Sequence, residues 1–346
     1  MRAVFSQFIK SKTFTLIVLL VVVVVFFQVT SPGSSFLSPA NIKNILDSMV
    51  IYILFAIGSG MLIISGYIDL SPGFIGVFAG IMVGSLLGNG IPWYISAVLT
   101  IAAGALFGLF NAFLVDVLRI QAFIATLATG SFIAKGIAMI ITDGKVLNIT
   151  DPTIVWIGTG KLPGGIPVAI VISLVLIIVF GIILAKTKFG RTIYLCGGNV
   201  TAAKFAGLNP RKLTYILFAI NGALGALAGV IYSGRMLIAN FTSTSNYTFP
   251  AITAAILGGI SFGGGSGGML GCFLGLLIIN SFNNGLTLLG VTPYWQSVFS
   301  GVLLLLALTF DYISIRNRMR IKPAKVHYDP RMWYKRNRNR EDGEIG

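Results

Sequence analysis

Residues 14–29 read FTLIVLLVVVVVFFQV and contain no charged side chain, which is the composition of a helix buried in lipid. Three basic residues, Arg2, Lys10 and Lys12, precede this run, as they would in a secretory signal peptide. A cleaved signal would have a shorter apolar core with small residues at the cut, and no A-x-A site follows here. The run therefore predicts a retained first membrane helix, with a cleaved signal as the alternative.

The rest of the chain continues this apolar character. Of its 346 residues, 55% are hydrophobic and only 10% are charged, and the mean hydropathy is +0.90. A soluble protein carries about 25% charged residues, so this chain cannot cover a water-facing surface, and its apolar content excludes disorder. The chain has one His and two Cys, which are too few to form a His/Cys metal site or a disulfide framework.

The predicted fold class is therefore an all-α polytopic membrane protein with about ten transmembrane helices, since each crossing needs about 20 mostly apolar residues. The segment 249–262 is short and flanked by Gly, which favours a broken helix or a re-entrant piece. The expected spans are residues 14–29, 44–65, 73–90, 93–118, 122–142, 166–186, 213–233, 249–262, 269–289 and 294–311.

Basic residues orient this bundle. Residues 1–12 carry three Lys or Arg and no acid, residues 186–212 carry six and no acid, and the stretch after Asp311 carries ten against four acids. Because cytoplasmic loops carry the excess of Lys and Arg, these three regions, both termini included, are predicted to be cytoplasmic. The loop 143–165 is mixed in charge and is predicted to lie outside.

Residues 1–311 are expected to form one transmembrane domain that includes the cytoplasmic loop 187–212. Residues 312–346 are expected to form a basic cytoplasmic tail, too short for a core of its own. Basic runs beside a membrane usually meet anionic headgroups, so the tail is expected to contact membrane lipid and not nucleic acid. Any soluble motor or receptor must then be a separate chain.

Glycines spaced by four residues predict close helix packing, because they leave a smooth stripe for a neighbouring backbone. Such spacing occurs at Gly76, Gly80, Gly84 and Gly88, at Gly104 and Gly108, and at Gly271 and Gly275.

Two other segments, 66–73 and 258–268, interrupt apolar runs with Gly, Ser or Pro, one in each half of the chain. Non-helical backbone at membrane depth persists only where protein or a wet cavity satisfies its polar groups. Paired interruptions therefore point to interrupted helices in both halves and to a transport pathway built from repeats, parallel or inverted. Ordinary tight loops at the membrane face are the alternative.

Polar residues inside the spans are few. Asp47, Asp69 and Asp116 lie within or at the ends of early helices, and no acidic residue occurs between Asp151 and Asp311. Uncharged amides and hydroxyls can bond a neutral polyhydroxyl solute, although they also bond neighbouring helices. The candidate pathway residues, with helix packing as the alternative role of each, are Asp69, Ser71, Asn111, Thr126, Asn221, Asn280, Asn283 and Asn284.

The loop 187–212 predicts a short helix on the cytoplasmic face. Asn199 can cap its start through the side-chain oxygen, Gly207 suits its end, and Pro210 follows as a breaker. An isolated helix of two turns is marginal in water, so this one needs something to dock on. Its small Ala202–Ala203 face is expected to enter a groove on a partner.

Five stretches in order resemble one family. FGRTIYLCGGNVTAAKFAGLN (189–209) resembles the coupling segment of ABC-importer permeases of the ribose, xylose and simple-sugar group, and GYIDLSPGFIG (66–76) resembles their G-I-D-L-S-x-G stretch. The other three are QAFIATLATGSFIAKGIAMIITDG (121–144), AITAAILGGISFGGGSGG (251–268) and NNGLTLLGVTPYWQSVFSGVLLLLA (283–307). Together they cover about residues 45–311.

The resemblance implies a multi-pass permease domain in the bacterial cytoplasmic (inner) membrane that works as a dimer, with a second copy or a related permease. It also implies cytoplasmic ATPase subunits that use ATP, and an extracytoplasmic solute-binding protein. Carried over by position, the ATPase-coupling residues are Gly197, Gly198, Asn199, Ala202, Ala203 and Gly207. The chain itself is expected to bind no cofactor.

The sequence departs from the family pattern at three places. Gln121 stands where Pro is usual, and Val200 and Thr201 stand where acids are common. Thr248 and Pro250 replace Glu and Asp of many sugar permeases, which puts the sugar identity in doubt more than the family.

The leading function is a gated pathway for a sugar or similar small polar solute, driven by partner ATPases. The chain lacks G-x-x-x-x-G-K-[ST], so it is expected to have no ATPase site of its own. A proton- or sodium-coupled carrier is the alternative, with Asp47, Asp69 and Asp116 as candidate relays. An intramembrane enzyme is the weakest hypothesis, because Cys196 and Cys272 suit packing and no acid–base cluster is visible.

Overall fold

The computed structural model describes residues 12–292 and then residues 294–296, 298–299, 301–302, 305–306, 308–309 and 312–313. Met1–Asp311 form one compact unit, to which the helices below belong, and Tyr312–Gly346 form a second. The predicted last span, 294–311, falls partly outside the described residues, and the predicted basic tail, 312–346, falls almost wholly outside them.

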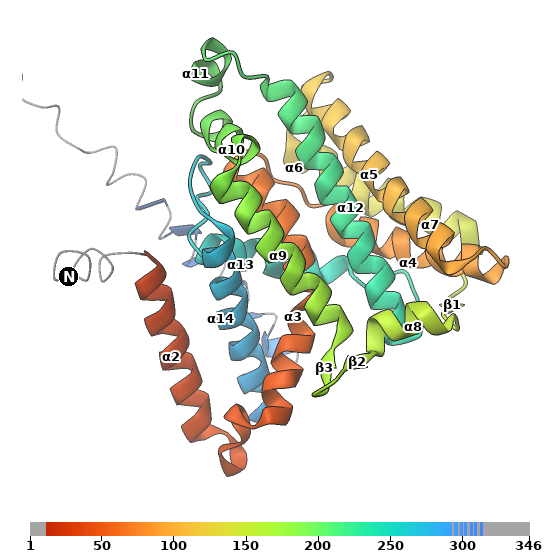
Figure 1. Cartoon of the computed structure of the whole chain (residues 1–346), viewed down its shortest axis with the longest axis vertical. Coiled ribbons are helices and arrows are strands. Elements are labelled where there is room, and N and C mark those ends of the chain that lie inside the picture. The colour runs from red at the N-terminus through yellow and green to blue at the C-terminus, as the bar shows by residue number, and fades with distance from the viewer. Residues whose placement is uncertain are drawn as a thin grey trace, which may run out of the picture. The chain divides into compact units, whose positions relative to one another are not determined.

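The described chain is mostly helical (Figure 1). The long helices are α2 (Lys12–Thr30), α3 (Pro39–Ile64), α5 (Trp93–Asp116), α9 (Val168–Lys186), α12 (Pro210–Met236) and α14 (Met269–Leu288). A further span joins α6 (Ala122–Ala128) to α7 (Lys135–Thr142) through the π-helical turn η2 (Thr129–Ala134).

Shorter elements connect these helices. They are η1 (Pro32–Leu37), α4 (Pro72–Gly88), β1 (Leu147–Asn148), α8 (Pro152–Thr159), β2 (Lys161–Leu162), β3 (Ile166–Pro167), α10 (Lys188–Gly198), α11 (Val200–Phe205), β4 (Ile238–Ala239), η3 (Ser245–Tyr247) and α13 (Thr248–Leu257). The strands pair antiparallel, β1 with β4 and β2 with β3.

Seven helices in the described residues are long and apolar enough to cross a membrane, and α4 is a shorter apolar helix. The all-α polytopic class is therefore confirmed, whereas the count of about ten spans stays a prediction. The first of the seven is the predicted N-terminal span. The predicted span 249–262 is shorter than expected, because α13 ends at Leu257 and irregular backbone follows through Gly268.

The bundle has two ends, which we name after the elements that lie there. Gly104 and Gly108 of α5 pack against α12 in reverse order, so these two helices are antiparallel. At one end, the α11 face, Asp116 pairs with Arg211 beside α10 and α11. At the other, the α8 face, Asp47 pairs with Arg235 near α8 and the β1–β4 ladder (Figure 1).

The stripes Gly104/Gly108 and Gly271/Gly275 pack against neighbouring helices, as predicted. In the third stripe Gly76 and Gly80 pack against α12, whereas Gly84 meets Leu147 and Ile149 and Gly88 meets nothing within 4 Å. A Cβ added at Gly108 would overlap the carbonyl oxygen of Phe218 in α12, and one at Gly271 would overlap that of Gly258. Gly76 of α4 lies equally close to Gly229 of α12. Backbone contact of this kind explains how α12 can hold α4 and α5 at once, since any larger side chain would separate the helices.

Helices α4 and α13 are each too short to cross a bilayer alone. The 17 residues of α4 and the 10 of α13 give lengths of about 26 and 15 Å, against a hydrocarbon core of about 30 Å. They meet at their N-termini, where the Gly73 N–H donates to Thr248 Oγ1 at 2.9 Å. Thr244 Oγ1 returns a hydrogen bond to the Gly73 carbonyl at 2.7 Å.

From this junction the two short helices run in opposite directions. Helix α4 ends toward the α8 face, where Gly84 lies against Leu147 and Ile149. Helix α13 ends toward the α11 face, where Gly258 packs on the start of α14. Each short helix follows a segment that leads inward from one face: 65–71, which is irregular, and 237–247, which contains β4 and η3. Opposite directions match an inverted repeat and not a parallel one, a choice that the sequence left open.

Candidate functional site

Five of the eight predicted pathway residues meet in one buried network at the start of α4. Asp69 Oδ1 accepts hydrogen bonds from Ser71 N at 2.8 Å and Ser71 Oγ at 2.6 Å, and Asp69 Oδ2 accepts one from Asn221 Nδ2 at 2.9 Å. Asn111 Nδ2 donates to Ser71 Oγ at 2.9 Å, and Leu70 N donates to Thr126 Oγ1 at 3.0 Å. These residues are at most 1% exposed apart from Leu70.

This network is closed to solvent and holds helices together. Both oxygens of Asp69 are bound by donors of the same chain, and the carboxylate lies at the N-terminus of α4, where the helix dipole favours negative charge. Through its partners it ties α4 to α5, α6 and α12. The arrangement supports the packing role that the sequence left open for these residues.

Sequence reasoning missed one member of the network. The Thr129 hydroxyl donates to Asn111 Oδ1 from the π-helical turn η2. Thr126 and Thr129 stand three positions apart, so they share a helix face, and that spacing was the available signal. Gly130 of the same turn approaches the backbone of Ser71, so η2 packs directly on the interrupted segment.

The other three predicted pathway residues, Asn280, Asn283 and Asn284 of α14, line a polar pocket of about 270 Å³ near the α8 face. Helices α3, α12 and α14 and Tyr247 contribute its walls. The polar side chains that line it are Ser48, Tyr52, Tyr232, Arg235, Tyr247, Asn280, Asn283, Asn284, Thr287 and Gln296. We call this cavity the amide pocket.

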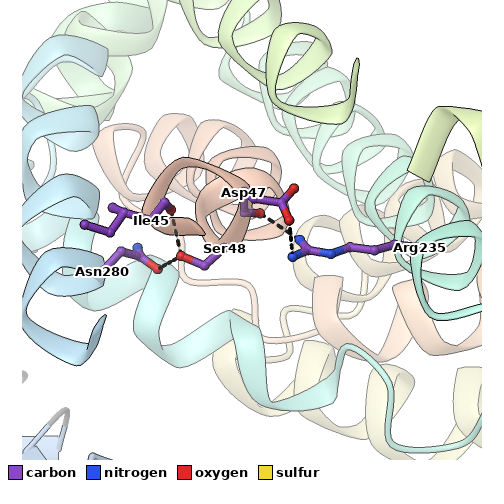
Figure 2. Close-up of polar contacts among 5 residues, drawn as sticks. All are labelled: Ile45, Asp47, Ser48, Arg235 and Asn280. Atoms are coloured by element: carbon purple, nitrogen blue, oxygen red, sulfur yellow. Dashed lines mark hydrogen bonds and ion pairs between the residues drawn. The ribbon is translucent and has the colours of Figure 1, made fainter. Parts of the chain in front are cut away.

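An ion pair stands at the edge of the amide pocket (Figure 2). The guanidinium of Arg235 donates to the Asp47 carboxylate at 2.6 Å and to the Asp47 carbonyl at 2.7 Å. Beside it, Ser48 Oγ donates to the Ile45 carbonyl at 2.7 Å and faces Asn280 Oδ1 at 3.4 Å. The pair fastens α3 to α12, and it neutralises the charge of Arg235 where the arginine meets the pocket.

Aromatic rings form the opposite part of the pocket wall. The ring centroids of Tyr52 and Tyr247 lie 4.7 Å apart, and those of Tyr232 and Tyr247 lie 5.8 Å apart. Tyrosines offer an apolar face and a hydroxyl together, which suits a solute with both C–H and O–H groups. Sequence reasoning did not select Arg235 or these tyrosines, because they lie on three separate segments that only the fold brings together.

The three asparagines of the pocket differ in their bonding. Asn284 Oδ1 accepts from Asn41 Nδ2 at 2.8 Å, and Asn280 Nδ2 donates to the Leu276 carbonyl at 2.9 Å. In contrast, Asn283 Oδ1 is buried and has no hydrogen-bond partner. A buried acceptor without a partner is unfavourable, so Asn283 is the member of the set with free capacity for a solute hydroxyl or water.

On the α11 face the predicted short helix is confirmed as α11. The side chain of Asn199 accepts a hydrogen bond from Ala202 N at 2.9 Å, which is the predicted cap. At the other end, Gly207 has φ +77°, and its N–H and that of Leu208 donate to the carbonyls of Lys204 and Ala203. This paired closure is a Schellman motif, for which a positive φ is required and Gly is preferred.

The predicted Ala202–Ala203 docking face is wrong in part. Ala203 is only 3% exposed, because it packs into this chain's own core. The exposed side of α11 instead carries Phe205, which is 88% exposed, together with Val200 at 46%. Phe205 also lies outside the helices that are long enough to cross a membrane. Phe205 is therefore the residue of α11 best placed to enter a partner's groove.

Gly197 packs inside the chain as well, whereas Gly198 is exposed and a Cβ there would meet nothing within 4 Å. A Cβ on Gly197 would overlap the Ile64 carbonyl at the end of α3, and the same carbonyl accepts the Gly265 N–H at 2.7 Å. Tyr194 Oη of α10 donates to the Gly267 carbonyl at 2.8 Å. The interrupted segment 258–268 is thus clamped between α10 and the end of α3.

Catalytic or metal-binding groups are not gathered in the part of the chain that the structure describes. No group of three or more His, Cys, Asp or Glu there could hold a metal ion. Cys196 and Cys272 are free and buried, as predicted, and burial raises the pKa of the Cys196 thiol. His327 lies outside the described residues.

A bundle of apolar helices with two opposed short helices, a buried polar junction and a polar pocket defines a membrane transport protein. The chain belongs to the family described as "Branched-chain amino acid transport system / permease component", whose profile matches residues 41–308. That range includes the junction, the amide pocket and α11.

Curated relatives are similar over most of the chain. It is 34% identical over 301 residues to the "Ribose import permease protein RbsC" of Escherichia coli (strain K12), with 86% of this chain and 92% of that protein covered. The protein of the same name from Bacillus subtilis (strain 168) is 35% identical over 294 residues, covering 84% and 90%. The "Xylose transport system permease protein XylH" of Haemophilus influenzae is 30% identical over 364 residues, covering 88% and 96%. No solved structure matches.

Proposed function

We propose that this chain is the membrane-spanning permease subunit of an ABC importer that moves a sugar or a similar small polar solute inward. The observation that carries the proposal is the family match over residues 41–308, since it includes both the amide pocket and α11. Relatives named for ribose import and xylose transport support a polyhydroxyl solute.

The amide pocket is proposed as the outer part of the solute pathway. Amide groups can donate and accept hydrogen bonds, and tyrosine rings can pack on the C–H face of a sugar. The Arg235–Asp47 pair keeps the pocket close to neutral, which favours an uncharged solute over an ion. Of the predicted pathway residues, Asn280, Asn283 and Asn284 have this role. The buried network around Asp69 serves as the hinge between the short helices α4 and α13.

Energy is proposed to come from cytoplasmic ATPase subunits that bind the α11 face. The chain has no phosphate-binding motif of the G-x-x-x-x-G-K-[ST] type, so ATP is used by the partner and no cofactor is bound here. A partner that contacts Phe205 would move α10, and the clamp on segment 258–268 would carry that movement to α3, α13 and α14. Gly207 and Asn199 keep α11 rigid enough to transmit it.

The assembly proposed is a pair of permeases, with a second copy or a related chain, served by an extracytoplasmic solute-binding protein. The location is the bacterial cytoplasmic membrane, with the α11 face and both termini inside. The basic residues near α10 and α11 support this orientation, because Lys186, Lys188, Arg191, Lys204, Arg211 and Lys212 all belong to that region.

The structure gives less support to an ion-coupled carrier. That alternative needs acidic residues that can exchange protons or sodium. Asp69 is bound on both oxygens inside the protein, Asp116 pairs with Arg211 at 2.5 Å, and Asp47 pairs with Arg235 at 2.6 Å. Each candidate relay already has a partner.

Transport in proteoliposomes tests the proposal. The chain is reconstituted with its cognate ATPase and binding protein, and uptake of radiolabelled ribose and xylose is measured with ATP inside the vesicles or with a proton or sodium gradient. We expect uptake only when ATP and both partners are present. Uptake by the permease alone, driven by an ion gradient, would establish the alternative carrier.

A further inference from the structure

An apolar groove lies between α9 and α14 on the α11 side of the bundle, apart from the amide pocket. It encloses about 640 Å³. Leu174, Ile178 and Ile182 of α9 form one wall, and Leu270 and Phe273 of α14 form the other. The side chains of both walls offer a polar solute no hydrogen-bond partner along the groove. The occupant must therefore be hydrocarbon.

The groove is as long as one leaflet of a bilayer. It follows α9 from Leu174 to Lys186, and this stretch of helix measures about 18 Å. Half of a hydrocarbon core of about 30 Å is about 15 Å. One end therefore lies near the middle of the membrane, and the other ends at Lys186, where the lipid headgroups begin.

The headgroup end carries positive charge. Lys186 lines the groove as the last residue of α9, and Lys188 and Arg191 are exposed on the first turns of α10. The sequence places no Asp or Glu between Asp151 and Asp311, so this segment supplies no acid of its own to neutralise them. Basic sites between membrane helices attract anionic headgroups.

We propose that this groove is a binding site for an anionic phospholipid, with an acyl chain along α9 and α14 and the phosphate beside Lys186. The site adjoins α10, because Tyr194 also lines the groove while its hydroxyl holds Gly267. Bound lipid therefore stabilises the connection between α9 and α10, which leads to α11. The inference does not depend on the identity of the solute.

Native mass spectrometry of the intact purified chain tests the site, without ATPase or binding protein. Delipidated protein is titrated with phosphatidylglycerol and, separately, with phosphatidylcholine. We expect tighter binding of phosphatidylglycerol, and an affinity about fivefold lower in Lys186→Ala, the effect of one basic residue near an anionic surface. Lys145→Ala, a lysine of the opposite loop, serves as the charge control and is expected to bind like the wild type.

A second variant tests the hydrocarbon part. A Cβ at Gly181 would make only an ordinary contact with Met269 at 3.4 Å, and Gly181 lines the groove, so Gly181→Leu adds a large side chain to the groove lining. We expect it to abolish tight phosphatidylglycerol binding, whereas Gly136→Leu, at an open helical position, leaves binding intact. Thermal unfolding of each variant checks the fold.

Two results would overturn the inference. One is equal binding of both lipids by the wild type, or unchanged phosphatidylglycerol binding in Lys186→Ala and Gly181→Leu when both are folded. The other is efficient disulfide formation between two copies of Leu270→Cys in native membranes, because a second protein chain would then fill the groove.

Discussion

At the scale of single residues, the chain separates two kinds of polar side chain that look alike in the sequence. The Asp69 carboxylate accepts hydrogen bonds from the Asn221 amide and from Ser71 at the start of α4. These hydrogen bonds give the two residues a structural role. Asn283 retains a buried oxygen without a partner, and it faces the amide pocket. Asn221 also has a buried oxygen without a partner, so position in the fold separates the two: Asn283 lines the amide pocket, whereas Asn221 lies in the closed network around Asp69.

Replacing Asp69 with Ala is expected to destabilise the protein. The change leaves the buried Asn221 amide and Ser71 groups without an acceptor, at about 1–3 kcal/mol for each unsatisfied group. The midpoint of thermal unfolding in detergent measures the loss. Asp143→Asn is the control, because that side chain is 93% exposed and Asn also tolerates the φ of 52° at this position, and it is expected to unfold like the wild type. Equal midpoints for the two variants would contradict a structural role for Asp69.

Replacing Asn283 with Leu is expected to have the opposite pattern. Removal of an acceptor that has no partner costs no hydrogen bond, so the thermal midpoint is expected to stay the same or rise. Uptake in proteoliposomes is expected to fall severalfold, because the pocket loses its free acceptor. A variant that transports at the wild-type rate would remove Asn283 from the pathway.

At the scale of elements, helix packing depends on glycine contacts and the coupling loop depends on caps. α12 touches α5 and α4 through backbone, with Gly108 against Phe218 and Gly76 against Gly229. α11 needs no such neighbour for its ends, because Asn199 and Gly207 close them with local hydrogen bonds.

Gly108→Ala is expected to separate α5 from α12 locally. Even a methyl group would overlap the Phe218 carbonyl, and overpacking of this kind costs about 1–3 kcal/mol. Gly136→Ala is the matched control, because its Cβ meets nothing within 4 Å, and Ala favours a helix by about 0.5–1 kcal/mol over Gly. Thermal unfolding of the two variants is expected to shift in opposite directions. The same shift in both would contradict the close contact.

Gly207→Pro is expected to uncouple ATP hydrolysis from transport while the membrane helices stay folded. Proline fixes φ near −65°, whereas Gly207 has φ +77°, and it removes the N–H that bonds Lys204. The assembled transporter is assayed for ATP hydrolysis and for solute uptake per ATP. Wild-type uptake per ATP in this variant would contradict the role of α11. A bulky residue at Ala203 is expected to act similarly, because that side chain is buried against the core.

At the scale of the whole molecule, the sequence predicted what local rules control. The apolar runs predicted the seven described helices that are long enough to cross a membrane, and Asn199 and Gly207 marked the ends of α11, because hydropathy and capping depend only on near neighbours. The amide pocket could not be predicted fully, because Tyr52, Arg235 and Tyr247 meet only through tertiary packing.

The depth in the membrane at which the interrupted helices stop could not be predicted, for a similar reason. Gly and Pro in the sequence show that a helix stops, but not how far from the membrane face it stops. That depth follows from contacts between distant segments, such as Gly73 with Thr248. The burial of Ala203 also depends on the core around it. The sequence near Ala203 therefore could not show that this side chain is buried and unavailable to a partner.

The proposed role of α11 is to bind the ATPase subunit on the cytoplasmic side. It is tested most directly by cross-linking in native membranes that contain the cognate ATPase subunit. Phe205→Cys is compared with Lys161→Cys, which is exposed in the loop at the α8 face; the natural Cys196 and Cys272 are buried. A cross-link to the ATPase is predicted from position 205 alone. No cross-link there, or one from position 161 instead, would contradict the account.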